Sequence, residues 1–368
     1  MIILIDPEAP DFSCYCAGAD RSLELRCASV EDLFPRLRES FGTLETVDTT
    51  ECVLYNGGGM FTAPVTLLTD ASLALLEKCV ALSPEQNELT LRLVRHLHEA
   101  LPQAPLLLAC ETAMFSALPA VASTYAIPLE LREKGIRRFG GNGLCHAWAC
   151  REARRLLPRR TRKVISVCLG DRPDIAAFLD GRAIETTVGF SPVEGVVSAY
   201  GCGDIDPTIV FLLQASGMSL QEVTRLLSKE SGLSALAEKR CTFSDIMKFW
   251  EDGDLALPRE VLIYGLKKQI GECAASLGGL DALVFESEDP PLARRLIKEI
   301  SHALTFMGLE YTGVCGGHPG VYSAPQSPVQ VCSLKHDKWV VLLEHAHSFL
   351  QKEDGNGYEE AGEVDRSS

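Results

Sequence analysis

The chain has 368 residues and a formal charge of -15, from 35 basic and 50 acidic side chains. A chain this acidic is a poor candidate for broad binding to nucleic acid, whose phosphates carry charge of the same sign. Its length predicts about two domains, and a hydrophobic content of 46% is enough for a sizeable core. No apolar run reaches the ~18 residues that span a bilayer, and the opening MIILID lacks the basic region and cleavage site of a signal peptide.

The 14 cysteines are scattered through the sequence. Because no secretory signal precedes them, we expect reduced, mostly buried thiols in a cytosolic protein. A metal site is the alternative, and three close groupings could supply one: Cys14-x-Cys16, Cys315-Gly-Gly-His318 and His345-x-His347. None of them repeats with the spacing of a zinc finger, so the sequence favours structural thiols over a metal centre.

In the first part of the chain, apolar runs alternate with amphipathic stretches. Residues 2–5 have the pattern of a buried strand, and residues 23–40 that of a strand and then a helix. Residues 52–63 predict an apolar strand that runs into glycines. Residues 86–98 place three leucines on one side of a helix, and residues 105–115 predict a buried strand that ends in a polar turn.

The second part of the chain repeats this alternation. Residues 164–169 predict a strand, and residues 178–187 a hairpin with Asp180-Gly181 at its turn. Residues 209–227 and 258–277 are helical by period, and a proline suits the first turn of the second of these. Residues 329–350 predict a strand followed by a helix.

The basic stretch PRRTRK at residues 158–163 separates two apolar segments, so it is a reasonable domain boundary. It is short enough that we expect a solvated surface there rather than an anion site. We therefore predict an N-terminal lobe over residues 1–158 and a C-terminal lobe over residues 159–350. The polar, acidic tail over residues 351–368 is expected to be disordered.

The most particular stretch is residues 185–207, ETTVGFSPVEGVVSAYGCGDIDP. Its glycines let the backbone turn tightly and approach a ligand, and it holds Glu194 and the pair Asp204 and Asp206. It resembles the signature of the acetate kinase family, DT[ST]MGFTPLEGLxMGTRSGDIDP, over its whole length. That family consists of carboxylate kinases within the sugar-kinase/actin/heat-shock ATPase superfamily. The family's arginine falls on Gly201 in this sequence.

A second dense match begins at Tyr125, where YAIPLEL and then EKGIRRFG resemble the family closely. The resemblance covers about residues 1–350. It implies an α/β fold of two ribonuclease-H-like (actin-like ATPase) lobes that meet at a central cleft. On this basis we expect the cleft to be lined by Asn56, Glu111, Asn142, His146, Asp171 and Asp204.

The resemblance also assigns catalytic positions. The family's proposed acid/base aspartate matches Glu111, whose side chain is longer by one methylene, and its phosphoryl-stabilising histidine falls on Asn142. A second family histidine survives as His146, although a histidine at the head of a helix is more often structural than catalytic. Together with Gly201, these are the candidate catalytic positions.

The family's substrate-binding arginine falls on Val53, and a family histidine falls on Asn56, which precedes Gly57. A guanidinium binds a carboxylate through two parallel charge-assisted bonds, and valine makes none. Tight-turn glycines at this point are expected to have a structural role.

The resemblance places a first nucleotide loop, NxGSSSLK in the family, at residues 6–13, where this chain reads DPEAPDFS and Ser13 replaces the lysine. Prolines remove amide donors, and Glu8 and Asp11 would repel phosphate. An ordinary surface turn is therefore the simpler interpretation. Asp6 could still hold magnesium, and Asp337 lies near the family's magnesium-binding glutamate.

Two further nucleotide loops of the family also carry acidic residues and prolines in this chain. The family's HLGNGAS loop reads LGDRPD here, with Gly170 kept and Asp171 added, and its TAGIGEN loop begins at Glu286-Ser287 and continues in acidic residues and prolines. The family's SDMR segment, whose arginine lies at the adenosine, matches at Asp245 but ends in Met247. ATP and magnesium are therefore cofactors implied by the resemblance alone.

We interpret the sequence as a degenerate member of the acetate kinase family with little or no acetate kinase activity. It would act as a binding or regulatory protein, as a homodimer in the manner of the family. One alternative is a remodelled phosphotransferase or hydrolase that uses Glu111 as a base and Asp6, Asp204 or Asp337 for metal. Another is a structural partner of a different metabolic enzyme.

Overall fold

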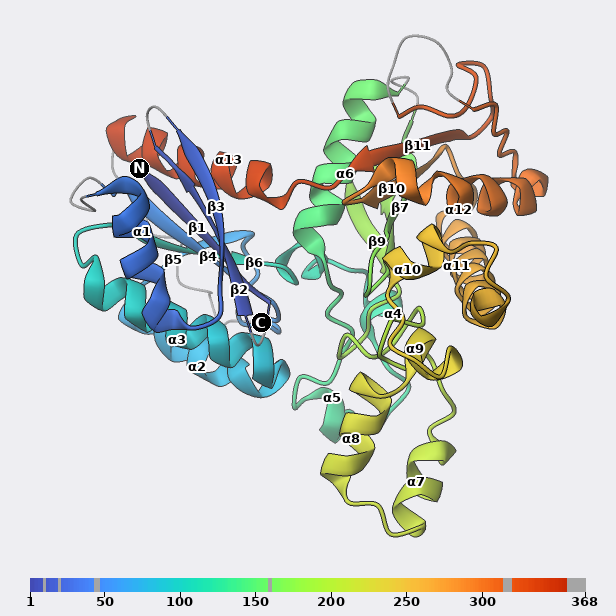
Figure 1. The fold of residues 1–368 in the computed structure, drawn as a ribbon, viewed down its shortest axis with the longest axis horizontal. Helices are drawn as coiled ribbons and strands as arrows, with labels where there is room; N and C mark the ends of the chain where they lie inside the picture. The colour runs from blue at the N-terminus through green and yellow to red at the C-terminus, as the bar shows by residue number, and fades with distance from the viewer. Residues whose placement is uncertain (9–10, 19–20, 43–46, 158–160, 314–319, 356–368) are drawn as a thin grey trace. The chain divides into compact units, whose positions relative to one another are not determined.

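In the computed structural model, the chain forms two compact units, each built around its own sheet (Figure 1). The first unit consists of Met1–Tyr55, Ala63–Cys110 and the segment from Lys338 onward; the second consists of Asn56–Thr62 and Glu111–Asp337. The structure describes residues 1–8, 11–18, 21–42, 47–157, 161–313 and 320–355.

The first unit has a six-stranded sheet in the order β3-β2-β1-β4-β6-β5. The strands are β1 (Ile2–Glu8), β2 (Asp11–Ala17), β3 (Ser22–Cys27), β4 (Thr49–Leu54), β5 (Val65–Leu67) and β6 (Leu106–Cys110). The first three form an antiparallel meander, β4 runs parallel to β1, and β6 runs parallel to β4. The helices are η1 (Val30–Asp32), α1 (Leu33–Phe41), α2 (Asp70–Cys79), η2 (Val80–Leu82), α3 (Pro84–Ala100) and α13 (Lys338–Gly355). Both α3 and α13 pack on β1 and β4.

The second unit has a five-stranded sheet in the order β11-β10-β7-β8-β9. The strands are β7 (Lys163–Cys168), β8 (Asp174–Leu179), β9 (Arg182–Thr186), β10 (Ala282–Ser287) and β11 (Gln330–Lys335). Again the first three form an antiparallel meander, followed by two parallel strands on the other side of the first. The two sheets therefore share one topology, apart from the extra edge strand β5. The predicted α/β class with two ribonuclease-H-like lobes is confirmed.

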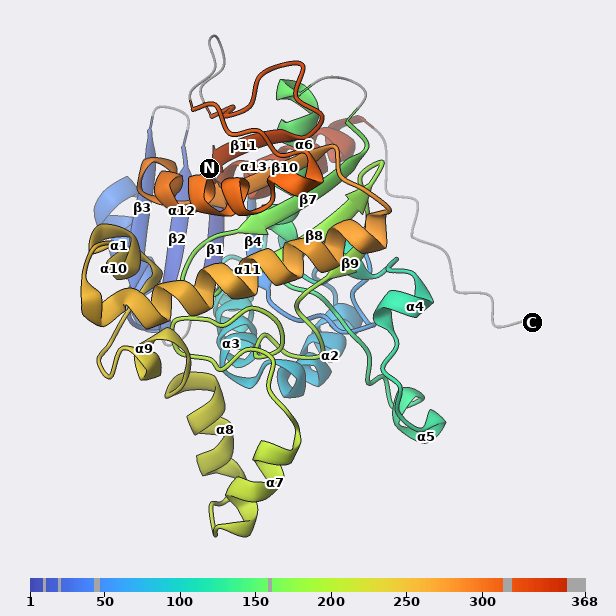
Figure 2. The same cartoon turned by 90° about the vertical axis from the view of Figure 1, so that its right-hand side faces the viewer.

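The helices of the second unit lie around this sheet and in the loops between its strands (Figure 2). They are η3 (Ala113–Phe115), α4 (Ala120–Ser123), α5 (Leu129–Arg132), α6 (Gly143–Leu156), α7 (Thr208–Ala215), α8 (Leu220–Lys229), α9 (Gly232–Leu236), α10 (Phe243–Lys248), η4 (Gly253–Leu255), α11 (Ala256–Leu277), α12 (Pro290–Ala303) and η5 (Thr305–Met307). Among the described residues, none of the helices is both long enough and apolar enough to cross a membrane.

The sheet of the second unit is covered on both faces, and alternate residues of each strand point to opposite faces. Val164, Phe178 and Val284 pack with residues of α6, whereas Ile165 and Phe285 pack with residues of α11 and α12. Even-numbered positions of β7, β8 and β10 therefore face α6. This parity decides where the polar residues of the same strands point.

Several predicted elements match the structure. The hairpin turn at residues 180–181 lies between β8 and β9, with positive φ at both Asp180 (53°) and Gly181 (83°), as a two-residue turn of this type requires. The surface turn predicted at residues 6–13 is instead part of two paired strands. β1 continues through Pro7, and Asp6 pairs with Ser13 of β2 in an antiparallel hairpin.

Other boundaries also differ from the predictions. The helical pattern at residues 209–227 breaks into α7 and α8, because Gly217 takes a positive φ of 99° and Ser219 caps a new helix. Helix α13 continues to Gly355, past the predicted helix end at residue 350. The grouping of residues also departs from a boundary at residue 158: α6 packs on β7 and β10 and so belongs to the second unit, whereas α13 packs on β1 and β4 and belongs to the first.

Candidate functional site

A row of polar side chains crosses the sheet of the second unit beneath α6. Asp174 at the start of β8 pairs in register with Cys168 at the end of β7, which pairs in turn with Glu286 of β10. All three are even-numbered residues of these strands, so they share the face that packs on α6. The carboxyl ends of the parallel strands β7 and β10 meet at this edge, where open α/β sheets bind their ligands.

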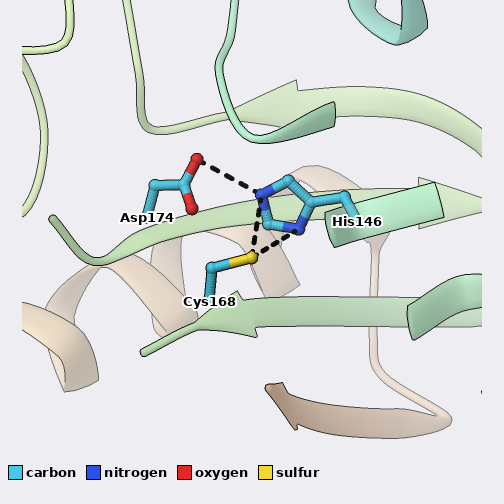
Figure 3. Close-up of side chains that lie close together, drawn as sticks. All are labelled: His146, Cys168 and Asp174. Carbon is cyan, nitrogen blue, oxygen red and sulfur yellow. Dashed lines mark hydrogen bonds and ion pairs between the residues drawn. The ribbon is translucent and has the colours of Figure 1, made fainter. Parts of the chain in front are cut away.

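His146 lies over this row, because α6 presents His146, Ala149, Cys150 and Ala153 as a buried stripe at helical spacing. The imidazole Nδ1 is 2.8 Å from Ser166 Oγ, and Nε2 is 3.3 Å from Asp174 Oδ2. Cys168 Sγ lies 3.8 Å from Nδ1 and 4.0 Å from Nε2 (Figure 3). Figure 3 shows the Asp174 carboxylate at one ring nitrogen and the Cys168 sulfur next to both.

Ser166 fixes the role of one ring nitrogen of His146. Its hydroxyl donates to Glu286 Oε1 at 3.0 Å, so the serine oxygen must accept the Nδ1–H of the imidazole. Burial lowers the pKa of His146, but the carboxylates of Asp174 and Glu286 raise it to about 9. A second imidazole borders the row: His336 Nδ1 lies 3.7 Å from Glu286 Oε2, and His336 Nε2 lies 3.4 Å from Cys145 Sγ.

The buried polar row destabilises the folded state. Asp174 and Glu286 are each 1% exposed, and both oxygens of Asp174 and one of Glu286 accept no hydrogen bond from the described residues. An unsatisfied buried polar group costs about 1–3 kcal/mol, and a charged one costs more. Burial accordingly raises the pKa of Glu286 to about 7. Buried groups of this kind in a native protein call for a specific cause, such as a bound ion or a functional role.

The first turn of α6 brings three predicted catalytic positions together. Glu111 follows β6, and its Oε2 accepts a hydrogen bond of 2.8 Å from the Leu144 amide, where the helix N-terminus favours a carboxylate. Asn142 is the residue before the helix, in the left-handed region with φ of 46°. A Cβ at Gly143 would come 2.0 Å from the Glu111 carbonyl oxygen, so only glycine fits this close approach.

The fourth predicted catalytic position, Gly201, lies in the loop of residues 185–207. Its amide donates to Ser198 Oγ at 2.7 Å. In the same loop, both oxygens of Glu194 are used in structural contacts, one with the hydroxyl of Tyr125 and one with Arg138 Nη2 at 2.9 Å. Asp204 accepts from the Gly195 amide and from Gln269. These side chains hold the loop in place.

The predicted substrate positions fall in different environments. Val53 is a buried residue of β4 in the first unit. Asn56 and Gly57 belong to the second unit, where Asn56 Oδ1 accepts from the Gly58 amide at 2.9 Å and the Gly57 amide donates to Thr112 Oγ1 at 3.1 Å. Because Thr112 follows Glu111 in the chain, this hydrogen bond places the turn at residues 56–58 next to Glu111.

The predicted nucleotide positions serve the local structure. Asp171, which follows Gly170, accepts from the Phe243 amide at the start of α10, and Asp245 caps the same helix through Thr242. Met247 is buried in α10. The Ser287 hydroxyl, next to Glu286, accepts from the Asp289 amide at 3.2 Å. Ser13 lies in β2 and is buried.

Asp6, the first predicted magnesium ligand, already has a cation. Its carboxylate pairs with the Lys338 ammonium and accepts a hydrogen bond of 3.2 Å from the Tyr55 hydroxyl, and Glu8 Oε1 lies 2.9 Å from the same ammonium. A carboxylate neutralised in this way does not fit a magnesium ligand. The second predicted ligand, Asp337, is half-buried at the end of the second unit.

The cysteine and histidine groupings seen in the sequence do not assemble into a centre within the described residues. The thiols of Cys14 and Cys16 lie 3.6 Å apart in the core, and His345 pairs with Glu51 while His347 points to solvent. The grouping at residues 315–318 lies outside the described residues. The described cysteines are free thiols.

Sequence reasoning missed the partners of His146. Ser166, Cys168, Asp174, Cys145 and His336 were not singled out as candidates. The signal was present, since polar residues two apart in a strand point to one face, and Ser166 and Cys168 interrupt an otherwise apolar β7 on the face of Val164. The register that aligns Cys168 with Asp174 and Glu286 cannot be read from one strand alone.

The Acetokinase family matches residues 30–343. The acetate kinase of Coprothermobacter proteolyticus is 32% identical over 321 residues, which are 84% of this chain and 79% of that protein. The acetate kinase of Halothermothrix orenii is 30% identical over 315 residues, which are 83% and 76% of the two chains.

Solved structures show the same fold. The acetate kinase of Porphyromonas gingivalis has a TM-score of 0.82 at 22% identity and covers 95% of this chain and 99% of its own. A propionate kinase from Francisella tularensis also reaches 0.82, at 21% identity, with 93% and 97% covered. The matched motifs, the family match over most of the chain and these folds agree. The chain belongs to the acetokinase family.

Proposed function

We propose that this member of the acetokinase family phosphorylates acetate slowly or not at all, and that it works as a binding or regulatory protein. One observation carries the proposal: carboxylates stand where the family resemblance places loops that hold nucleotide phosphates. Phosphoryl transfer depends on positioning and on neutralising charge at the transferring group. Carboxylates at these positions act in the opposite direction.

In the first unit, the carboxylates are those of Asp6 and Glu8. The place of the family's first phosphate loop is taken by the β1–β2 hairpin, in which backbone groups pair across the ladder. The Lys338 ammonium lies against both carboxylates, so it is not available to a phosphate. This unit therefore offers neither a glycine-rich loop nor a spare cation at that point within the described residues.

In the second unit, the carboxylates are those of Asp171 and Glu286. Asp171 is fixed by the Phe243 amide, and Glu286 is buried against Ser166.

Val53 and Gly201 stand where the resemblance places two arginines, and loss of one transition-state arginine can cost about 10³-fold in rate. Such losses do not simply add within one catalytic unit, but they all act in one direction.

The test is turnover of acetate and Mg-ATP, measured as acetyl hydroxamate, with an active acetate kinase of the family assayed beside it. We expect product at no more than a trace of the rate of the active enzyme. Titration calorimetry with Mg-ATP should show weak or absent binding. Turnover within about 10-fold of the active relative, a gap smaller than one missing arginine would produce, would defeat the proposal.

A remodelled phosphotransferase is the second candidate, and the setting of Glu111 favours it. The carboxylate is oriented by the Leu144 amide, as a positioned base would be. Tight binding of Mg-ATP, with turnover that Glu111→Gln abolishes, would support this candidate. Absence of nucleotide binding would favour a partner role beside another metabolic enzyme.

Assembly and location are part of the proposal. A homodimer is supported by α7, whose apolar side chains include Phe211 and Leu212, 65% and 68% exposed. A second copy of the chain could cover that surface. A cytosolic location is compatible with the free, mostly buried thiols of the described cysteines.

A further inference from the structure

We propose that His146, Cys168 and Asp174 form a binding site for one thiophilic divalent cation, with Zn²⁺ as the best fit. The site lies wholly within the second unit, between α6 and the ends of β7 and β8. The site shares His146 with the candidate catalytic positions, but it uses none of the positions that the family resemblance assigns to magnesium.

The distances among the three ligand atoms suit tetrahedral coordination. With bonds of about 2.0–2.3 Å from Zn²⁺ to nitrogen, oxygen and sulfur, neighbouring ligand atoms lie about 3.3–3.7 Å apart. His146 Nε2 is 3.3 Å from Asp174 Oδ2 and 4.0 Å from Cys168 Sγ. All three atoms lie within 4.8 Å of one another (Figure 3). The nitrogen–oxygen edge already has the required length. Cys168 Sγ lies nearer to Nδ1, at 3.8 Å, than to Nε2, so the thiol would have to turn toward Nε2 to complete the set.

The surroundings of His146 are those of a metal ligand. A metal-bound histidine almost always donates its other ring N–H to an oxygen, which fixes the tautomer and the orientation of the ring. Here Nδ1 donates to Ser166 Oγ, and Ser166 donates onward to Glu286. Nδ1 is thereby occupied, and Nε2, which faces Asp174, is the ring nitrogen left for a cation that would displace its proton.

Burial gives an independent indication. His146 is 0% exposed, Asp174 1% and Cys168 7%, and neither carboxylate oxygen of Asp174 accepts a hydrogen bond from the described residues. A buried carboxylate is ordinarily paired or bound to a metal. Asp174 Oδ2 has an ion-pair partner in His146 Nε2 at 3.3 Å, and a cation at the centre of the three ligands would take the place of the Nε2 proton and engage the carboxylate, the thiolate and the imidazole together.

The donor set selects the kind of cation. Thiolate and imidazole ligands suit Zn²⁺, whereas Mg²⁺ and Ca²⁺ require oxygen ligands. Three protein ligands leave a fourth position for water, the arrangement of zinc sites that are open to a further ligand. The proposal therefore specifies Zn²⁺, or Co²⁺ as its spectroscopic substitute, at one equivalent per chain.

The test uses the full chain without a histidine tag, stripped of metal by a chelator and then titrated with Co²⁺ and Zn²⁺. We expect one equivalent of Co²⁺ bound, with a thiolate-to-cobalt charge-transfer band in the near ultraviolet and ligand-field bands of a tetrahedral site. Zn²⁺ should displace the cobalt and raise the melting temperature of the stripped protein, since a ligand that binds only the folded state stabilises it.

Variants identify the ligands. Cys168→Ser should remove the charge-transfer band. Asp174→Asn removes a direct ligand, so it should weaken Zn²⁺ binding by more than about 10-fold, which is the smallest effect expected when only a hydrogen-bond partner of a ligand is lost. Ser166→Ala, which removes that outer partner, should weaken it by about 10–100-fold. The control is Cys150→Ser, another buried thiol on the same side of the sheet but outside the group, which should leave the band unchanged.

Two results would overturn the proposal. One is the absence of stoichiometric cobalt binding to the wild-type chain, which would leave a simple His146–Asp174 ion pair. The other is a charge-transfer band that survives Cys168→Ser and disappears in Cys150→Ser. If Cys168→Ser fails to fold, the wild-type spectrum and the Asp174→Asn titration decide the matter.

Discussion

Lys338 is the most informative residue for the stability of the first unit, and we predict that Lys338→Met is strongly destabilising. The ammonium lies against Asp6, which is 6% exposed, and Glu8, which is 36% exposed; Lys338 itself is 21% exposed. Removal of one partner from a buried ion pair costs about 3–5 kcal/mol, because the other charge stays buried and unpaired. The exposed partner adds little, so we expect a loss of about 3 kcal/mol, the lower end of that range.

The loss should depend on pH in a direction that the structure fixes. Burial raises the pKa of the Asp6 carboxyl, and Lys338 opposes that rise, so the pKa rises further in the variant. A carboxyl whose pKa is higher in the folded state loses stability as the pH rises through that pKa. A protonated Asp6 needs no counter-charge, and the fraction of Asp6 that is protonated increases as the pH falls. The deficit relative to wild type should therefore be larger at pH 8 than at pH 5.

The assay is urea unfolding followed by the fluorescence of Trp339, which stacks on Tyr15 in the first unit. Replacing Trp148 and Trp250 by phenylalanine leaves Trp339 as the sole indole, since the chain has 3 tryptophans. The control is Lys352→Met, an exposed lysine on the same helix.

Two outcomes would refute the reasoning about Lys338. One is a loss no greater than that of the Lys352→Met control. The other is a deficit that is the same at both pH values. Adding Asp6→Asn to the variant should recover much of the loss, because an amide needs no counter-charge.

Two further predictions concern close packing and assembly. Gly143→Ala should destabilise the second unit by about 1–3 kcal/mol in thermal or urea unfolding, because its Cβ would meet the Glu111 carbonyl. Gly265→Ala, on α11 with nothing within 4 Å, should be neutral or stabilising by up to about 1 kcal/mol, and equal effects would contradict the argument. Phe211→Asp should convert the proposed homodimer to a monomer in light scattering, whereas Phe306→Asp, at an even more exposed position elsewhere (81% against 65%), should leave the dimer intact.

The elements of the fold were largely predictable because each carries a local signal. The strand at residues 164–169 and the hairpin at residues 178–187 follow from apolar runs and from one Asp-Gly turn. The division into units was not predictable from local signals. Helix α13 is next to β11 in sequence but packs on β1 and β4, and the amino acids of one helix do not specify which sheet it covers.

The candidate site divides in the same way. Glu111, Asn142 and His146 were predicted as site positions, and the structure brings them together at the first turn of α6, though it does not test their catalytic roles. Cys168 and Asp174 come close to His146 through strand register and through the packing of α6 on the sheet. Both are tertiary properties. A pattern of polar residues along one strand indicates a polar face, but it does not indicate which residues of the next strand lie opposite.

The two units offer a comparison that bears on the proposed cation. In each unit, a buried carboxylate of the sheet forms an ion pair with a basic side chain of a helix: Asp6 pairs with Lys338, and Asp174 pairs with His146. An ammonium has only donors, so the first pair is complete as an ion pair. An imidazole whose Nδ1 is held by Ser166 can give up its Nε2 proton to a cation, and Cys168 adds a sulfur beside the ring. The same architecture therefore yields a closed ion pair in one unit and a set of metal ligands in the other, and only the second should respond to zinc.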